Sequence, residues 1–329
     1  MILGVEDENG TVYGIGDQSP FKLSDAISNN NLLSPFLLAA SDFMVGVLPI
    51  IIIAFVYLCI DKRQGYFMMT AMWGTCVVNQ LLKNTCCVYR PWIRDASIVP
   101  YGNSIQTATG YSFPSGHTEY ATTFFGSIGL WLRRWWVWLL CILAVLVIGF
   151  SRNYLGVHTP YDVGVAIIES VLMLWAFSAL FRWLEKHPEK DIWVLVGGIA
   201  VLIAYLLYVS FKPYPMDYNA DGQLIVEPKK MITDCYYAAG LAFGVLTGWF
   251  IEHSYIRFSV SGKWYLRLLR FAFAAVAIVL IQKLLIPYLL TLCSPDLVLP
   301  LANCLMVWTF TLLIPLCSIR FTGLLPHHA

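Results

Sequence analysis

Apolar stretches of roughly 20 residues recur along this chain and constrain its fold more than any other feature. A helix of that length crosses the hydrocarbon core of a bilayer, because each residue adds about 1.5 Å to its rise. Hydrophobic residues make up 58% of the 329 residues and charged residues only 12%. An ordinary soluble domain is about 25% charged. A chain with so few charges cannot cover a water-facing surface, so we expect an all-α fold, a polytopic transmembrane helix bundle.

The apolar runs predict about nine membrane spans. These spans lie near residues 43–60, 66–83, 113–132, 135–150, 158–181, 192–211, 235–252, 268–290 and 296–318. The chain divides into an N-terminal segment over 1–42, a membrane core over 43–182 and additional transmembrane helices over 183–329. Within the first segment, residues 21–40 mix apolar and polar positions, which favours a helix lying along the membrane interface.

The distribution of Lys and Arg predicts which side of the membrane each loop faces. Alternate loops form two sets, one with twelve Lys and Arg residues and the other with eight. Because positive residues accumulate on the cytoplasmic side, the first set is cytoplasmic and residues 1–42 lie outside the cytoplasm. The short loops favour a bacterial plasma membrane. We therefore expect an integral, multi-pass membrane protein.

Three clusters of polar residues stand at span ends on the predicted non-cytoplasmic side. They are KNTCCVYRP (83–91), PSGH (114–117) and SRNYLGVHTPYD (151–162). Polar and ionisable groups near hydrocarbon are costly and usually functional. Because all three clusters share one membrane depth, we expect their side chains to form one site.

The cations of these clusters predict a site for a tetrahedral dianion. Arg90 and Arg152 offer forked donors and Lys83 offers a point charge. Ser115 and Gly116 stand at a helix start, where free backbone N–H groups and the helix dipole also favour an anion. Glycine further allows the backbone to approach the ligand closely.

The histidines and the carboxylate of these clusters predict acid–base and nucleophilic chemistry. His158 and Asp162 are four residues apart, so on a helix they share a face. A carboxylate on one imidazole nitrogen orients the ring and leaves the other nitrogen free to attack, while His117 can act as the general acid. This pattern favours phosphoryl transfer through a histidine nucleophile. We expect no metal and no cofactor, because the cations can stabilise the transferred group themselves.

In order and spacing, the clusters resemble the three-part signature of the type 2 phosphatidic acid phosphatase superfamily. The matching residues are Lys83-x6-Arg90-Pro91, Pro114-Ser115-Gly116-His117 and Ser151-Arg152-x5-His158-x3-Asp162. The superfamily includes lipid phosphate phosphatases, glucose-6-phosphatase, sphingosine-1-phosphate phosphatases, bacterial undecaprenyl-diphosphate phosphatases and vanadium haloperoxidases. The resemblance implies an all-helical bundle with its site at the outer end.

The resemblance also implies a role for each matching residue. His158 is the implied nucleophile, Asp162 its orienting partner and His117 the proton donor. The implied phosphate-binding residues are Lys83, Arg90, Ser115, Gly116 and Arg152. The implied activity is a metal-independent phosphoric monoester or diphosphate hydrolase acting on a lipid phosphate, of the phosphatidic acid, sphingosine-1-phosphate, phosphatidylglycerol phosphate or polyprenyl diphosphate class.

The same motifs leave other substrates and other functions open. The span layout is similar to that of glucose-6-phosphatase and the sphingosine-1-phosphate phosphatases, so a soluble sugar phosphate is an alternative substrate. A groove open sideways to lipid between the third and fifth spans would favour a lipid. A haloperoxidase is a remote alternative, and so is an anion transporter or binding protein. A transport pathway would need ionisable residues at several depths, where we find only Lys283. The expected partners are membrane lipids, with no nucleic acid; the sequence does not indicate an oligomeric state.

Overall fold

The computed structural model describes residues 4–6, 12–14, 33–101, 104–219 and 222–317. Within these ranges helices joined by loops make up the chain, together with a small antiparallel hairpin of β1 (Gly4–Glu6) and β2 (Val12–Gly14) and an isolated bridge between Tyr218 and Leu224. The interfacial helix predicted over 21–40 falls outside the described residues as far as residue 32. From residue 33 the chain is already in a helix that packs against the bundle.

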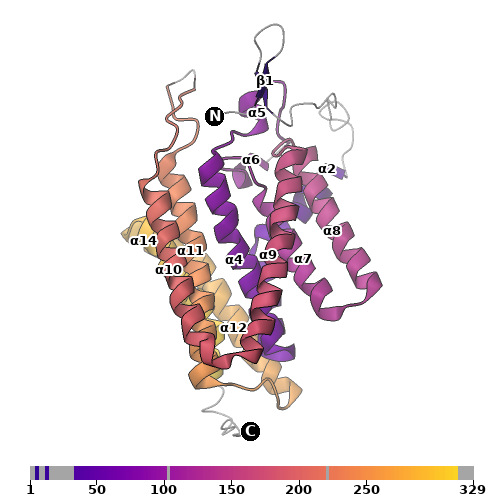
Figure 1. The fold of residues 1–329 in the computed structure, drawn as a ribbon, viewed down its shortest axis with the longest axis vertical. Helices are drawn as coiled ribbons and strands as arrows, with labels where there is room; N and C mark the ends of the chain where they lie inside the picture. Colours follow the sequence, from indigo (N-terminus) through magenta and orange to yellow (C-terminus); the bar gives the residue numbers. More distant parts are fainter. Residues whose placement is uncertain (1–3, 7–11, 15–32, 102–103, 220–221, 318–329) are drawn as a thin grey trace.

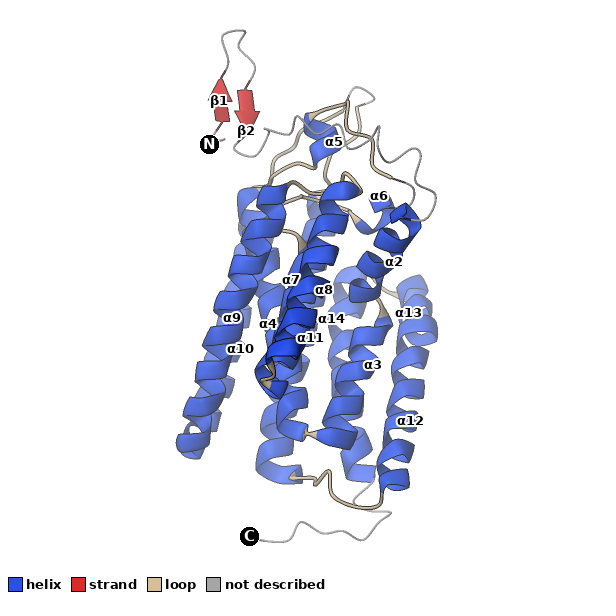
Figure 2. Ribbon diagram, turned by 90° about the vertical axis from the view of Figure 1, so that its right-hand side faces the viewer, coloured by secondary structure: helices blue, strands red, loops and turns tan. Residues whose placement is uncertain are grey.

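Long helices running along one axis form the bundle (Figures 1 and 2). Its first half contains α2 (Leu33–Val45), α3 (Val47–Phe55) with its π-helical continuation η1 (Val56–Ile60), α4 (Lys62–Cys86), α7 (Gly116–Leu132), α8 (Trp135–Tyr154) and α9 (Pro160–Lys186). The second half contains η2 (Pro188–Lys190), α10 (Asp191–Phe211), α11 (Pro228–Ile251), η3 (Glu252–Ile256), α12 (Trp264–Leu280), η4 (Ile281–Leu285), α13 (Ile286–Leu292), α14 (Pro295–Trp308) and η5 (Thr309–Leu313). The short helices α5 (Pro91–Arg94) and α6 (Ser104–Thr107) lie at one end of the bundle, uppermost in both views.

The apolar helices show a multi-pass membrane protein, although they do not establish nine spans. In the described part of the chain, five helical segments are long and apolar enough to cross a membrane. A sixth appears if the bent pair α2 and α3, which meet at 55°, counts as one span. The predicted second, third and seventh spans correspond to α4, α7 and α11. They fall short of this criterion because α7 has only 17 residues and the other two helices carry charged and small polar side chains.

Helix α4 lies at the centre of the first half and packs against α7, α9 and α11. Asp61 caps its start by accepting a hydrogen bond from the N–H of Gln64 at 3.0 Å. The helix ends where Cys87 adopts a left-handed conformation, with a φ of 49°. Because α4 buries Trp73 and Met69 in the core and Lys83 near its C-terminal end, it carries the first polar cluster to the level of α5 and α6.

The second half of the bundle joins the first through a buried ion pair at the opposite end. Lys62 lies 2.9 Å from Glu252, whose side chain is fully buried and also accepts a hydrogen bond from the N–H of Phe258. Within the second half, α11 packs closely on α14. A Cβ added at Gly240 would lie 2.4 Å from Cα of Pro300, so glycine is required there for the two helices to meet.

We predict that Gly240→Ala destabilises the bundle by about 1–3 kcal/mol, because the added methyl group forces α11 away from the backbone of α14. Thermal unfolding in detergent measures this loss. Gly197→Ala on α10 is the matched control, since a Cβ there meets no atom within 4 Å. Equal melting temperatures for the two variants would contradict the prediction.

Candidate functional site

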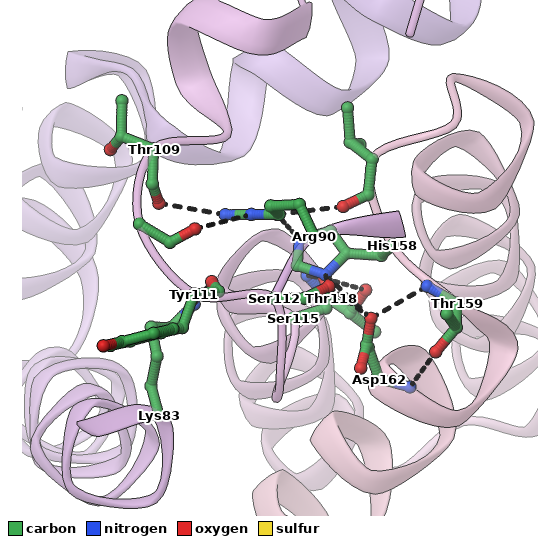
Figure 3. A network of polar contacts seen from close by, with 12 residues as sticks. Lys83, Arg90, Thr109, Tyr111, Ser112, Ser115, Thr118, His158, Thr159 and Asp162 are labelled. Atoms are coloured by element: carbon green, nitrogen blue, oxygen red, sulfur yellow. Dashed lines mark hydrogen bonds and ion pairs between the residues drawn. The ribbon is translucent and has the colours of Figure 1, made fainter. Parts of the chain in front are cut away.

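The three polar clusters meet at the end of the bundle that carries α5 and α6 (Figure 3). The side chains come from the C-terminal ends of α4 and α8, the starts of α7 and α9, and the loops beside them. The structure therefore brings the predicted site residues of all three clusters into one buried region. Segments more than 60 residues apart in sequence contribute to it, as the contact between Arg90 and His158 illustrates.

Arg90 is held by backbone carbonyls from two other segments. Its guanidinium donates hydrogen bonds to the carbonyl oxygens of Thr109 (3.0 Å), Gly110 (3.1 Å) and Val157 (2.9 Å). Nη1 also lies 2.9 Å from Nε2 of His158, and the residue is only 3% exposed. Burial is the main cause that lowers the pKa of Arg90 to about 9, and the charge of Arg152 acts in the same direction. The forked side chain is thus fixed in place before any ligand binds.

Arg152 and Lys83 complete the group of buried cations. Arg152 donates to Oγ of Ser41 on α2 at 2.6 Å, yet its Nε and Nη2 are buried without a hydrogen-bond partner in the described chain. Within the described residues, the Lys83 side chain makes one long hydrogen bond, 3.4 Å from Nζ to the carbonyl oxygen of Tyr111. A buried N–H without a partner is costly, so the free donors of Arg152 are poised for an acceptor such as an oxyanion.

His158 is oriented by groups on both ring nitrogens. Nδ1 lies 3.5 Å from Oδ2 of Asp162 and 3.4 Å from Oγ of Ser112, whereas Nε2 faces Arg90. Because Arg90 can only donate, Nε2 is the acceptor and Nδ1 carries the proton that points toward Asp162. The pKa of His158 lies well below its ordinary value of 6.5, chiefly because of burial and then because of Arg90, while the Asp162 hydrogen bond opposes the shift.

Asp162 serves the local fold as well as His158. Its Oδ2 accepts hydrogen bonds from the Ser112 hydroxyl at 2.6 Å and from the N–H of Thr159 at 2.8 Å. The Thr159 hydroxyl in turn accepts from the N–H of Asp162, so the two residues form a capping box at the start of α9. The cap fixes the carboxylate beside His158, because the first turn of α9 cannot rotate without breaking it.

The PSGH cluster forms the start of α7. Oγ of Ser115 caps the helix by accepting from the N–H of Thr118, and the N–H of Ser115 donates to the carbonyl oxygen of Asp162. Ser115 therefore positions α7 against α9, a structural use that the sequence did not indicate. His117 is 5% exposed and its buried Nε2 has no partner within the described residues. A Cβ added at Gly116 would meet only Oδ1 of Asn79, at 4.0 Å, so packing does not require glycine there.

Sequence reasoning missed several polar residues around this region. Ser41 and Ser112 are common residue types whose partners lie more than 45 positions away, so no local signal marks them. Glu119 and Glu169 are different, because a carboxylate inside an apolar run is itself a signal of function. The expectation that only Lys283 stands at another membrane depth was wrong: Glu119 and Glu169 are buried within α7 and α9, whereas Lys283 is exposed.

An apolar groove runs along α7, α8 and α9, beginning about one turn from Thr118. Its volume is about 390 Å³, within the usual range for ligand pockets, and its lining includes Thr122, Gly126, Leu146, Val171 and Trp175. Leu146, Val171 and Trp175 are more than half exposed, so the groove opens on the outer surface of the bundle. This is the sideways opening between the third and fifth predicted spans that a lipid substrate would need.

Comparison with known proteins identifies two matching regions. Residues 64–186 match the PAP2 superfamily, and residues 236–325 match the transmembrane extension of PAP2 superfamily phosphatases. The first region contains every predicted site residue. The second corresponds to α11 and the helices that follow it. No solved structure matches the chain.

Individual relatives match over part of their length. An undecaprenyl-diphosphatase of Sulfolobus acidocaldarius is 43% identical over 56 residues, which cover 17% of this chain and 26% of the relative. Phosphatidylglycerophosphatase B of Escherichia coli K12 is 41% identical over 86 residues, covering 25% of this chain and 32% of the relative. The putative undecaprenyl-diphosphatase YbjG of the same organism is 40% identical over 81 residues, covering 25% and 39%. The chain thus matches less than half the length of each relative.

We predict that inorganic phosphate stabilises the purified protein through Arg152. Phosphate at roughly 100 times its Kd adds about 2.7 kcal/mol to the free energy of unfolding if it binds only the folded state. Thermal unfolding detects this gain when phosphate is compared with chloride at the same ionic strength. Arg152→Gln removes the unpartnered donors and should abolish the shift. Arg182→Gln, on the opposite end of α9, is the control that keeps it. A shift that survives Arg152→Gln would show that phosphate binds elsewhere.

The lowered pKa of His158 predicts that its ring stays neutral below pH 6.5. Since the folded-state pKa lies below the unfolded value, the neutral ring persists as the pH falls through 6.5 and becomes charged only at lower pH. Histidine-labelled protein followed by NMR measures this titration, and the signal lost in His158→Gln identifies the residue. Titration of that signal at or above 6.5 would contradict the burial argument.

Proposed function

Since the chain belongs to the PAP2 superfamily, which is the phosphatase superfamily that its three motifs resemble, we propose that it hydrolyses the phosphate ester of a membrane lipid through a phosphohistidine at His158. The observation that carries the proposal is the orientation of His158, with Nδ1 toward Asp162 and Nε2 beside the guanidinium of Arg90. An attacking nitrogen next to a fixed cation is suited to a phosphoryl group.

In the first step, Nε2 of His158 forms a bond to phosphorus and the bond from phosphorus to the ester oxygen breaks. Lys83, Arg90 and Arg152 bind the equatorial oxygens, for which Arg152 has two unpartnered donors. His117, whose Nε2 is unpartnered among the described residues, donates a proton to the leaving oxygen. A monoester thereby releases a lipid alcohol, and a diphosphate releases a lipid monophosphate.

In the second step, water attacks the phosphohistidine and gives its proton to the now neutral His117. The bond between phosphorus and Nε2 of His158 breaks, which regenerates the imidazole and releases phosphate. The two histidines and the three cations supply the nucleophile, the acid and base, and the charge stabilisation, so we propose that the reaction needs no metal.

A lipid substrate is favoured over a soluble sugar phosphate by the groove along α7, α8 and α9. Its apolar lining and its opening on the bundle surface suit a hydrocarbon chain whose headgroup enters the site. Two of the relatives are named for undecaprenyl diphosphate and one for phosphatidylglycerophosphate. We propose these two substrate classes, a polyprenyl diphosphate or a phosphatidylglycerol phosphate, as the first to test.

We further propose that nine helical segments cross the membrane and place the site on the non-cytoplasmic side, in a bacterial plasma membrane. The polar α4, α7 and α11 would then cross inside the bundle, where neighbouring helices cover their polar faces. Residues 43–182 would form the catalytic core and residues 183–329 the additional helices. The two regions matched by the PAP2 superfamily and its extension support this division.

We predict that His158→Ala lowers phosphate release by roughly a thousandfold or more, because the variant lacks the nucleophile. The substrates are undecaprenyl diphosphate, phosphatidylglycerol phosphate, phosphatidic acid, sphingosine-1-phosphate and glucose-6-phosphate, each with and without EDTA. His253→Ala, at the opposite end of the bundle and half exposed, is the matched control. With radiolabelled substrate and an alkaline quench, an alkali-stable, acid-labile label on the wild type and not on His158→Ala would identify the phosphohistidine.

The outcomes separate the alternatives. Release that persists in His158→Ala would overturn the nucleophile assignment. Sensitivity to EDTA would overturn metal independence. Preference for glucose-6-phosphate over every lipid would favour the sugar-phosphate alternative, since a lipid groove would then serve no substrate.

A further inference from the structure

The segment 109–112, between α6 and α7, touches the candidate site with each of its four residues (Figure 3). Its first two carbonyl oxygens accept hydrogen bonds from Arg90 at 3.0 and 3.1 Å, and its third accepts one from Lys83 at 3.4 Å. The hydroxyl of its last residue donates to Asp162 at 2.6 Å. This one segment therefore places two cations and a carboxylate of the site, and any shift of its backbone would move all three.

The second half of the bundle packs directly against this segment. Met231, in the first turn of α11, is only 1% exposed. A Cβ added at Gly110 would overlap Sδ of Met231 and would lie 3.2 Å from its Cε. The fully buried Tyr111 shares an apolar cluster with Met231 and with Val226, which precedes α11. The backbone of the segment therefore rests on the start of α11.

Gly110 makes this close approach possible. Its φ of 71° lies in the left-handed region, which glycine adopts without strain, and the missing side chain leaves room for the thioether of Met231. The carbonyl oxygen of the same residue accepts the hydrogen bond from Nε of Arg90 at 3.1 Å. A single residue thus carries both the contact with α11 and a contact with the cationic site.

The first polar cluster is also bonded to the second half of the bundle. Asn84 follows Lys83 and is fully buried, and its Nδ2 donates to Sγ of Cys235 on α11 at 3.0 Å. At the other end of the cluster, the hydroxyl of Tyr89 donates to Oδ2 of Asp217 in the loop before α11 at 2.5 Å. The chain that connects the two cations is therefore held at both ends by residues of the second half.

We propose that Met231 is a positioning residue of the phosphate site and that the second half of the bundle acts through it to place Arg90 and Lys83. This inference rests on the proposed function, because these cations are the ones that would bind the phosphate. A thioether offers a phosphate no hydrogen-bond donor, so Met231 acts by packing alone. Close-packed interiors transmit displacement, and removal of the thioether lets the segment 109–112 relax into the space left behind.

The inference gives the additional helices a part in the chemistry. Helix α11 carries Met231, and five residues later it begins the region, 236–325, that matches the transmembrane extension of PAP2 superfamily phosphatases. These helices then do more than cover the catalytic core, because the cations keep their geometry only while α11 is in place.

A purely stabilising role for Met231 predicts a different kinetic signature. If a variant only lowers the folded fraction, the apparent kcat falls while KM and the affinity for phosphate stay the same, because each remaining folded molecule is intact. Displaced cations weaken the binding of the phosphate itself, so KM and the Kd of inorganic phosphate both rise.

The test is calorimetric binding of inorganic phosphate to the purified full-length protein, together with kcat and KM for the substrate that the wild type prefers. For Met231→Ala we expect both the phosphate Kd and KM to rise roughly tenfold, since a displacement of about 1 Å in a positioned group costs up to about a hundredfold. Met231→Leu keeps the volume of the side chain and should stay within about twofold of the wild type.

Met306→Ala is the matched control. Met306 is a fully buried methionine of the second half, on α14, and it belongs to a different apolar cluster. Its loss should lower the melting temperature as Met231→Ala does, with the phosphate Kd and KM unchanged. Val226→Ala removes a smaller group from the cluster of Met231 and covers the case in which Met231→Ala does not fold. It should raise the phosphate Kd by roughly two- to threefold.

The results separate this inference from the proposed function. Wild-type values of the phosphate Kd in Met231→Ala and Val226→Ala overturn the inference and leave the proposed function standing. A Met231→Leu variant as impaired as Met231→Ala also overturns it, because packing would then not be the cause. An equal rise in Met306→Ala shows a general loosening of the bundle and overturns it too. Wild-type protein that neither binds phosphate nor releases it from any substrate contradicts the proposed function, and the inference falls with it.

Discussion

The hydrogen bonds of Arg90 hold the candidate site together. One guanidinium ties the loop after α4 to the carbonyls of Thr109 and Gly110, which precede α7, and to Val157, which precedes α9. It also reaches His158. The first cluster, the loop that precedes α7 and the third cluster are thereby fixed relative to one another by a single planar side chain with five donors. Such a link is strong because it is buried, and its loss would leave three carbonyls without a partner.

The low dielectric of the bundle interior explains much of what surrounds this link. The desolvation penalty of a buried cation, histidine or carboxylate is offset there only by a hydrogen-bond partner or an opposite charge. Asp162 is therefore held by Ser112 and Thr159 as well as by His158, and Arg152 by Ser41. The same requirement accounts for the polar faces of α4, α7 and α9. These helices bury Asn79, Glu119 and Glu169 against one another rather than against lipid.

The second half of the bundle supports the site from a distance. Its helices contribute none of the residues predicted for the site, yet they cover α4, which carries Lys83. The close contact of α11 with α14 and the buried pair of Lys62 and Glu252 keep these helices in register with the core. The groove along α7, α8 and α9 lies on the part of the core where hydrocarbon chains can approach.

The sequence by itself determined the helical membrane fold and the three motifs. Apolar length and charge position are local properties, and the spacing of His158 and Asp162 within one helical turn is local as well. Only the tertiary structure decided that Ser112 and Ser41 join the site, that Ser115 caps α7 against α9, and that Asn79 of α4 donates a hydrogen bond to Glu169 of α9. These relations depend on which faces of separate helices pack together, and helix packing is set by side-chain shape across the whole bundle rather than by any short stretch of sequence.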